Sequence, residues 1–264
     1  MTFPRAELLA AAERSLTAAG SRDRAGWVGL FTANGQVEDP VGSRPHRGQT
    51  EITRFYDTFI GPRDITAHRD VDLVSGRTVV RDLELEVAMA PSVTMRIPVY
   101  IRYDLRPVGT ELKLDRLRAY WELPAMVRQF ARSGLASVPV GLRLTRALLR
   151  NQGPGGAVGF LGGLWGPGAR ARRAFTRFLD DARAGDEVAV RRGLAKGAQI
   201  TTGDDGVSGA AELLDRLAGC RRRKLIAAGR SLVVGLERNG ERAVLFAEVN
   251  SRPFTIARVR YFAA

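Results

Sequence analysis

The spacing of apolar residues changes once in the first half of the chain, and this change restricts the fold more than any other feature. In the first 60 residues apolar side chains recur at helical spacing, as in Leu8, Leu9, Ala12 and Leu16. From Asp64 onward they alternate with polar residues on a two-residue period. Helices followed by an antiparallel meander indicate an α+β domain with its helices on one face of a sheet.

The individual elements follow from these two periods. We expect helices over residues 5–19, 22–31 and 48–59, and a short strand over Gln36–Asp39 that Pro40 closes. Turn signals such as Ser75-Gly76 separate the alternating segments. The four predicted meander strands are Ile65–Val74, Thr78–Ala88, Val93–Leu105 and Glu111–Trp121.

The order of elements begins again in the second half of the chain. Leu123–Ser133 and Val140–Gln152 have helical spacing, and tracts as glycine-rich as Gly153–Gly168 seldom hold regular structure. From Arg170 the order helix, helix, strand, helix, meander returns, with Thr202 where the first half has Asp39. We therefore expect a domain over residues 1–122, a helical and glycine-rich connector over 123–169, and a divergent second copy over 170–264.

Charge and composition exclude several classes of function. The net charge is +13, but nearly all positive residues are arginines that aromatic residues do not interleave, so we expect no specific nucleic-acid partner. No apolar run reaches the roughly 20 residues that span a bilayer, and helical spacing begins directly after Met1, so we expect a cytoplasmic protein. Cys220 is the single cysteine, which gives no basis for a disulfide, a metal site or a redox cofactor.

One segment resembles a known family. Trp27-Val28-Gly29-Leu30-Phe31, Val37-Glu38-Asp39-Pro40-Val41-Gly42-Ser43 and Phe55-Tyr56 are similar, without a gap, to the bacterial ketosteroid isomerases and SnoaL-like proteins of the nuclear transport factor 2 superfamily. The resemblance covers residues 5–122 and weakens through the strands. It implies a cone-shaped, cystatin-like α+β domain whose helices pack on one face of a curved antiparallel sheet, with a second such domain in tandem.

The resemblance also implies chemistry. In that family the aspartate of this segment is the general base, and a tyrosine and a protonated aspartic acid hydrogen-bond the developing oxyanion. Asp39 is therefore the expected base, but Ser15 and Val99 occupy the two donor positions. Because the loss of one donor costs roughly 100-fold to 1000-fold in rate, another group must replace them for catalysis to survive. Tyr56, at the place of a family tyrosine near the donors, is the expected replacement.

Strand alternation predicts the wall of an apolar pocket. If Val99 faces the helices, its neighbours two residues apart do so too, and the next strand contributes a matching set. The expected pocket residues are Phe55, Val99, Ile101, Tyr103, Leu117, Ala119 and Trp121. The same residues would serve equally well as an ordinary core between sheet and helices. Limonene-type epoxide hydrolysis is disfavoured, because Ala119 stands at an acidic position of that chemistry and Arg102 and Asp104 share the opposite face.

Two functions and several partners stay open at this stage. The chain is either an acid-base isomerase of a steroid-like or polyketide-like carbonyl compound, or a non-catalytic binder of a hydrophobic ligand or a scaffold. The two copies pair either with each other as a pseudo-dimer or with another chain. The arginines of the connector, Arg128, Arg132, Arg143, Arg146 and Arg150, lie at helical spacing and either contact anionic lipid or are simply solvated, and the second alternative is favoured.

Overall fold

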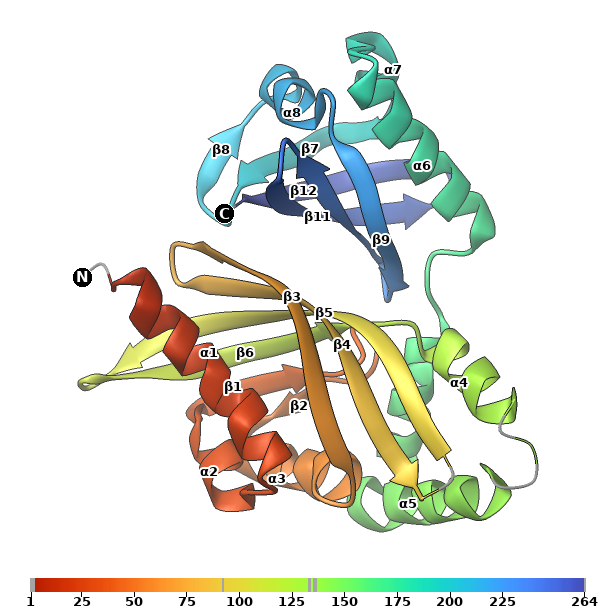
Figure 1. Ribbon diagram of the computed structural model, residues 1–264. Helices are drawn as coiled ribbons and strands as arrows, with labels where there is room; N and C mark the ends of the chain where they lie inside the picture. The colour runs from red at the N-terminus through yellow and green to blue at the C-terminus, as the bar shows by residue number, and fades with distance from the viewer. Residues whose placement is uncertain (1–2, 92, 133, 135–136, 264) are drawn as a thin grey trace. The chain divides into compact units, whose positions relative to one another are not determined.

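Two mixed β-sheets organise the chain, one in each of two units (Figure 1). The computed structural model describes residues 3–91, 93–132, 134 and 137–263. Met1–Asp72 and Arg77–Trp165 form the first unit, and Leu73–Gly76 and Gly166–Ala264 form the second. Both sheets have six strands, in the orders β2-β1-β6-β5-β4-β3 and β8-β7-β12-β11-β10-β9. The same order in both sheets agrees with the predicted tandem arrangement.

The first sheet consists of the four strands of the predicted meander and of two strands that precede them in the chain. Its elements in chain order are α1 (Arg5–Gly20), α2 (Arg24–Gly29), β1 (Phe31–Glu38), β2 (His46–Arg47), α3 (Gly48–Phe55), the π-helix η1 (Tyr56–Ile60), β3 (Asp64–Ser75), β4 (Thr78–Ala90), β5 (Val93–Val108) and β6 (Glu111–Tyr120). Helix α1 crosses one face of this sheet (Figure 1). The sheet is not wholly antiparallel as expected, because β1 pairs with β6 in parallel. Strand β1 is separated from the meander by α3, which lets it run in the same direction as β6.

Asp23 sets the start of α2, and α3 changes its form before the predicted end. Asp23 caps α2 by accepting a hydrogen bond from the backbone nitrogen of Gly26 at 2.8 Å. The predicted helix over residues 48–59 keeps its α-helical form only to Phe55 and then widens into η1, where the backbone nitrogen of Gly61 donates to the carbonyl oxygen of Tyr56 at 2.9 Å. Single π-helical turns of this kind are frequent at functional sites.

The connector contains more helix than its glycine content predicts. Helix α4 spans Leu123–Arg132, α5 spans Ser137–Leu161, and the short 3-10 helix η3 spans Gly162–Leu164. Ser133, the end of one predicted helix, lies outside the described residues. The prediction that Gly153–Gly168 lacks regular structure is wrong for its first half. Gly153 has φ 68°, which ends one helical segment of α5, and Pro154 directly opens the next.

The second unit repeats the order of the first, except that β9 follows α8 directly, without a π-helix like η1. It consists of α6 (Ala169–Arg183), α7 (Glu187–Gly193), β7 (Leu194–Thr202), β8 (Gly206–Ser208), α8 (Ala210–Leu217), β9 (Arg221–Ala228), β10 (Ser231–Arg238), β11 (Glu241–Ser251) and β12 (Phe254–Ala263). Asp186 caps α7 as Asp23 caps α2, and β7 pairs in parallel with β12 as β1 does with β6. When β7 is aligned with β1 by these registers, Thr202 stands at the position of Asp39, directly after the counterpart of Glu38.

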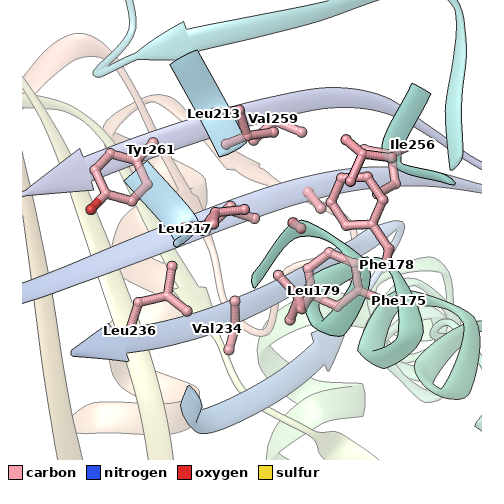
Figure 2. Packing of buried hydrophobic residues seen from close by; sticks show 14 of the residues in the cluster. Phe175, Phe178, Leu179, Leu213, Leu217, Val234, Leu236, Ile256, Val259 and Tyr261 are labelled. Carbon is pink, nitrogen blue, oxygen red and sulfur yellow. The ribbon is translucent and has the colours of Figure 1, made fainter. Parts of the chain in front are cut away.

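Side chains from α6 and α8 pack against the second sheet. Figure 2 shows Phe175, Phe178 and Leu179 from α6 beside strand residues such as Val234 and Ile256. Phe175, Val234 and Ile256 have no exposed surface. These side chains form the apolar core of the second unit. The second unit has the neutral Thr202 where the first has the carboxylate of Asp39.

Candidate functional site

Asp39 lies immediately after β1, where that strand ends beside β6. The register pairs Glu38 with Arg118, and the backbone nitrogen of Val41 donates to the carbonyl oxygen of Ala119 at 2.8 Å, so the chain is held on both sides of Asp39. The indole Nε1 of Trp121 donates a hydrogen bond to Oδ1 of Asp39 at 2.5 Å. The carboxylate is thus fixed at the edge where two parallel strands end together.

The environment of Asp39 raises its affinity for protons. Burial raises the pKa of Asp39 from 3.8 to about 6, and the hydrogen bond from Trp121 offsets part of this effect. The residue nevertheless keeps some exposed surface. At pH 7 a carboxylate with this pKa is mostly ionised, yet it is much more basic than an exposed aspartate.

Asp39 borders a small apolar cavity. The cavity has a volume of about 100 Å³ and is partly open to solvent. Apart from Asp39 and Arg63, its walls are apolar or aromatic. They are formed by Phe55, Phe59 and Ile60 of α3 and η1, by Ile65, Leu85, Val87, Met89 and Ile97 of β3, β4 and β5, by Trp121 after β6, and by Met126, Leu144 and Phe160 of α4 and α5.

The cavity contains only part of the predicted pocket set. Phe55 and Trp121 line it, whereas Val99, Ile101, Tyr103, Leu117 and Ala119 are not among its lining residues. Those five do share one sheet face, because Tyr103 pairs with Leu117 and Ile101 with Ala119. They are buried, and the hydroxyls of Tyr103 and of Ser15 in α1 hydrogen-bond each other at 3.1 Å. At these positions the alternative of an ordinary core describes the structure better.

Tyr56, the expected replacement donor, does not line the cavity. Its ring packs against Trp27 with centroids 5.6 Å apart, and its hydroxyl makes no hydrogen bond to any described residue. Burial raises the pKa of Tyr56, and the carboxylates of Asp23 and Asp57 raise it further. The charged groups that shift the pKa of Tyr56 thus lie at α2 and η1, and Asp39 is not among them.

The arginine and acid pair considered for epoxide hydrolysis lies on the other sheet face. Asp104 accepts hydrogen bonds from Arg102 Nε at 2.8 Å and from Arg118 Nη2 at 2.6 Å. Burial opposes ionisation of Asp104, but Arg118 and Arg102 outweigh it, and the pKa of Asp104 stays below its usual value. This cluster faces away from Val99 and from the cavity, as alternation along β5 predicts.

The connector supplies a wall of the cavity, which sequence analysis did not anticipate. The rings of Phe160 in α5 and Phe59 in η1 stack with centroids 5.0 Å apart. Asn151 and Gln152 each donate a hydrogen bond to the Thr58 hydroxyl of η1 at 3.2 Å. The apolar residues around Phe160 were the one available signal, but nothing in the sequence indicates which surface they cover.

Glycines allow the end of the connector to approach the Asp39 loop. A Cβ atom added to Gly163 would lie 2.7 Å from Cγ of Pro40, and one added to Gly162 would lie 2.9 Å from the carbonyl oxygen of Gly42. The backbone nitrogen of Arg44 also donates to the carbonyl oxygen of Gly159 at 3.0 Å. The glycine-rich tract is therefore a close-packing surface against the segment that follows the expected base.

The connector arginines named in the sequence analysis are all exposed. Leu142 and Leu149 of α5 are exposed as well, at 67% and 50% of their surface. Apolar and basic side chains therefore share the solvent side of α5, so contact with an anionic lipid surface stays a prediction. Within the described residues, every helix is too short or too polar to cross a bilayer.

Similarity to known proteins covers about half of the chain. Residues 7–129 match the model of the nuclear transport factor 2 (NTF2) domain, and no curated protein matches the sequence. A Δ5-3-ketosteroid isomerase from Mycobacterium sp. is 27% identical, over 46% of this chain and 96% of its own, with a TM-score of 0.41. A Mycobacterium tuberculosis protein in complex with estradiol-17β-hemisuccinate is 22% identical, over 45% and 95%, with a TM-score of 0.41. An LEH-like epoxide hydrolase from M. tuberculosis is 16% identical, over 52% and 97%, with a TM-score of 0.42.

Proposed function

We propose that this chain, whose amino-terminal half belongs to the nuclear transport factor 2 (NTF2)-like family, moves a proton between two carbons of an apolar carbonyl compound. Asp39 is the general base. Its carboxylate takes a proton from a carbon next to the carbonyl group, which leaves an enolate, and returns the same proton to another carbon of the conjugated system. No atom is gained or lost, so the product is an isomer of the substrate.

One observation carries this proposal: the only carboxylate that lines the described cavity is fixed by an indole and has a pKa of about 6. A base near this value combines ionisation at neutral pH with useful basicity, which is the balance that general-base catalysis requires. The partly buried position removes water from the carboxylate without keeping it neutral. The apolar walls favour a hydrocarbon skeleton over a polar substrate.

The size of the cavity limits which substrates fit. Cavities of about 150 Å³ accommodate benzene, and this one measures about 100 Å³. A six-membered ring already needs more room than this, so a steroid-like or polyketide-like compound would have to displace Phe160 of α5 to bring its reacting ring to Asp39. We therefore propose that binding of a polycyclic compound requires α5 to move.

A non-catalytic binder is the second candidate. Ser15 and Val99, which occupy the two family donor positions, favour this candidate, because both are buried and neither lines the cavity. Without a donor for the enolate oxygen the proton transfer would be slow. The same apolar cavity would still bind a hydrophobic ligand.

Turnover and binding together separate the two candidates. We would incubate the full chain with a Δ5-3-ketosteroid, follow the absorbance of the conjugated enone, and measure binding in parallel by tryptophan fluorescence. Asp39→Asn keeps the shape and loses the basicity, so it should lower turnover by about 1000-fold or more and leave binding intact. Equal turnover of the wild type and the variant ends the enzyme hypothesis, whereas binding without turnover supports the binder.

A further inference from the structure

Arg63 is a second charged residue in the wall of the Asp39 cavity, and the proposed reaction does not use it. It lies in the turn between η1 and β3, where its backbone nitrogen donates to the carbonyl oxygen of Ile60 at 3.0 Å. Only 8% of its surface is exposed. The guanidinium is therefore held at the cavity by the turn and is largely shielded from bulk water.

The described residues give the guanidinium of Arg63 only neutral contacts. Its Nη1 donates to the carbonyl oxygen of Thr58 at 2.7 Å, and its Nε lies 3.1 Å from the sulfur of Met89, a weak acceptor. Its Cζ lies 6.0 Å above the ring of Phe59. Of the described residues, none places a carboxylate within ion-pair distance of Arg63, and none accepts a hydrogen bond from its Nη2.

The other buried arginines of this unit have carboxylate partners. Arg81, with 1% exposed surface, lies between the carboxylates of Glu13 and Asp72. Arg102, with 4% exposed surface, pairs with Asp104. An unpaired buried charge is costly, and proteins normally pair such charges. Arg63 is an exception, and its position in a cavity wall suggests that its counter-ion comes from a ligand.

Arg63 and Asp39 do not neutralise each other. They form no ion pair, and Arg63 is not among the groups that shift the pKa of Asp39. Burial lowers the pKa of Arg63 to about 10, which still leaves the guanidinium protonated at neutral pH. The cavity thus presents a carboxylate and a guanidinium separately, within otherwise apolar walls.

We propose that Arg63 binds a carboxylate of the ligand, so that the cavity takes an apolar compound that carries this anionic group. One hydrogen of Nη1 is engaged by Thr58, which leaves its second hydrogen and those of Nη2 to form the end-on fork that fits a carboxylate. This inference deepens the proposed function, because it rests on the same cavity and adds an acid group to the substrate class. It does not depend on turnover.

A pair of probes with the same skeleton tests the proposal. Cyclohexanecarboxylate and the neutral cyclohexanecarboxamide would be titrated into the full chain at pH 7.5 and constant ionic strength, with dissociation constants from calorimetry. The wild type should bind the carboxylate at least tenfold more tightly than the amide. Arg63→Met, which keeps an unbranched apolar stem, should lose this preference and bind the amide within about threefold of the wild type.

Three further variants make the outcome decisive. Arg54→Met removes the same charge from an exposed position on α3 and should leave both constants unchanged. Asp39→Asn should keep the preference for the carboxylate, so a failure of the proposed catalysis and a failure of this inference give different results. Arg63→Lys keeps the charge without the fork and should retain only part of the preference.

A measurement on the free protein adds an independent readout. Arg63 is a buried charge with no counter-ion in the part of the chain that the structure describes, so Arg63→Met should raise the midpoint of thermal unfolding without ligand. The carboxylate should stabilise the wild type more than the variant. Three results would overturn the inference. The wild type does not bind the carboxylate at millimolar concentration, it does not prefer the carboxylate to the amide, or Arg63→Met shows the same preference as the wild type.

Discussion

Trp121 and Asp39 lie just beyond the ends of the neighbouring parallel strands β6 and β1, and the indole Nε1 of Trp121 donates a hydrogen bond to Oδ1 of Asp39. The indole has a single donor, and this contact uses it. Trp121 therefore tunes the carboxylate and is not free to stabilise the oxygen of a substrate. The pair therefore sets the basicity of the candidate site.

Trp121→Phe should raise the pKa of Asp39 further. The hydrogen bond stabilises the ionised form, and a bond of this kind is worth about one pKa unit. We would titrate carbon-13-labelled aspartate by NMR and assign Asp39 from the signal lost in Asp39→Asn. The midpoint should be near 6 in the wild type and about one unit higher in Trp121→Phe. Trp27→Phe, a change outside the cavity wall, should leave it unmoved, and an unchanged midpoint in Trp121→Phe would contradict the prediction.

Asp39→Asn should stabilise the protein at high pH only. The pKa of Asp39 is raised from 3.8 to about 6, so between these values the folded chain holds a proton that the unfolded chain has lost. The free energy of unfolding therefore falls as pH rises through this window, by at most roughly 3 kcal/mol at about 1.4 kcal/mol per unit. Denaturant unfolding should show a gain from Asp39→Asn at pH 8 and almost none at pH 4. Equal effects at both pH values would show that the carboxylate is not destabilised by burial.

Tyr56→Phe should leave any activity within about threefold of the wild type and should not destabilise the fold. The Tyr56 hydroxyl is buried and makes no hydrogen bond to the described residues, so its removal relieves a desolvated polar group. We expect a gain of about 1 kcal/mol in thermal or denaturant unfolding. A loss of activity of 100-fold or more with intact ligand binding would instead make Tyr56 the oxyanion donor.

Gly163→Ala should weaken the packing of the connector against the Asp39 loop. The added Cβ atom would lie 2.7 Å from Cγ of Pro40, and overpacking of this kind typically costs about 1–3 kcal/mol. Gly155→Ala is a matched control in the same tract, since a Cβ atom there meets no neighbour within 4 Å and alanine favours helix. Gly163→Ala should lower the midpoint of thermal unfolding and weaken ligand binding, whereas Gly155→Ala should do neither. Equal behaviour of the two variants would show that the connector does not pack on this loop.

Vesicle sedimentation tests the predicted lipid contact of the connector. If the exposed arginines of α4 and α5 bind lipid, the protein should sediment with anionic vesicles, less so as ionic strength rises, and not with neutral vesicles. Arg143→Gln with Arg146→Gln should reduce sedimentation, whereas Arg170→Gln with Arg173→Gln, the same loss of charge on α6, should not. A protein that stays in the supernatant with anionic vesicles at low salt has a connector that only braces its own domain.

The sequence alone determined the order of the longer elements and the position of the expected base. Helical spacing, two-residue alternation and turn signals are local properties, so they predicted all four meander strands and the repeated order of the longer elements, but not the short strands β2 and β8. The segment around Asp39 indicated the base because its residues are contiguous. Even the shared inward face of Val99, Ile101 and Tyr103 followed from alternation alone.

Only the tertiary structure decided which inward-facing side chains meet empty space. A cavity is a gap in packing, so it depends on which helix covers which part of a sheet. Helix α1 packs closely on the sheet near Tyr103, through the small residues Ala12 and Ser15, and leaves the predicted pocket filled. The gap opens instead beside Ile97, under a connector that no local pattern connects to it. That Arg63 has no carboxylate partner among the described residues likewise depends on all the side chains packed around it, and no local sequence pattern predicts this.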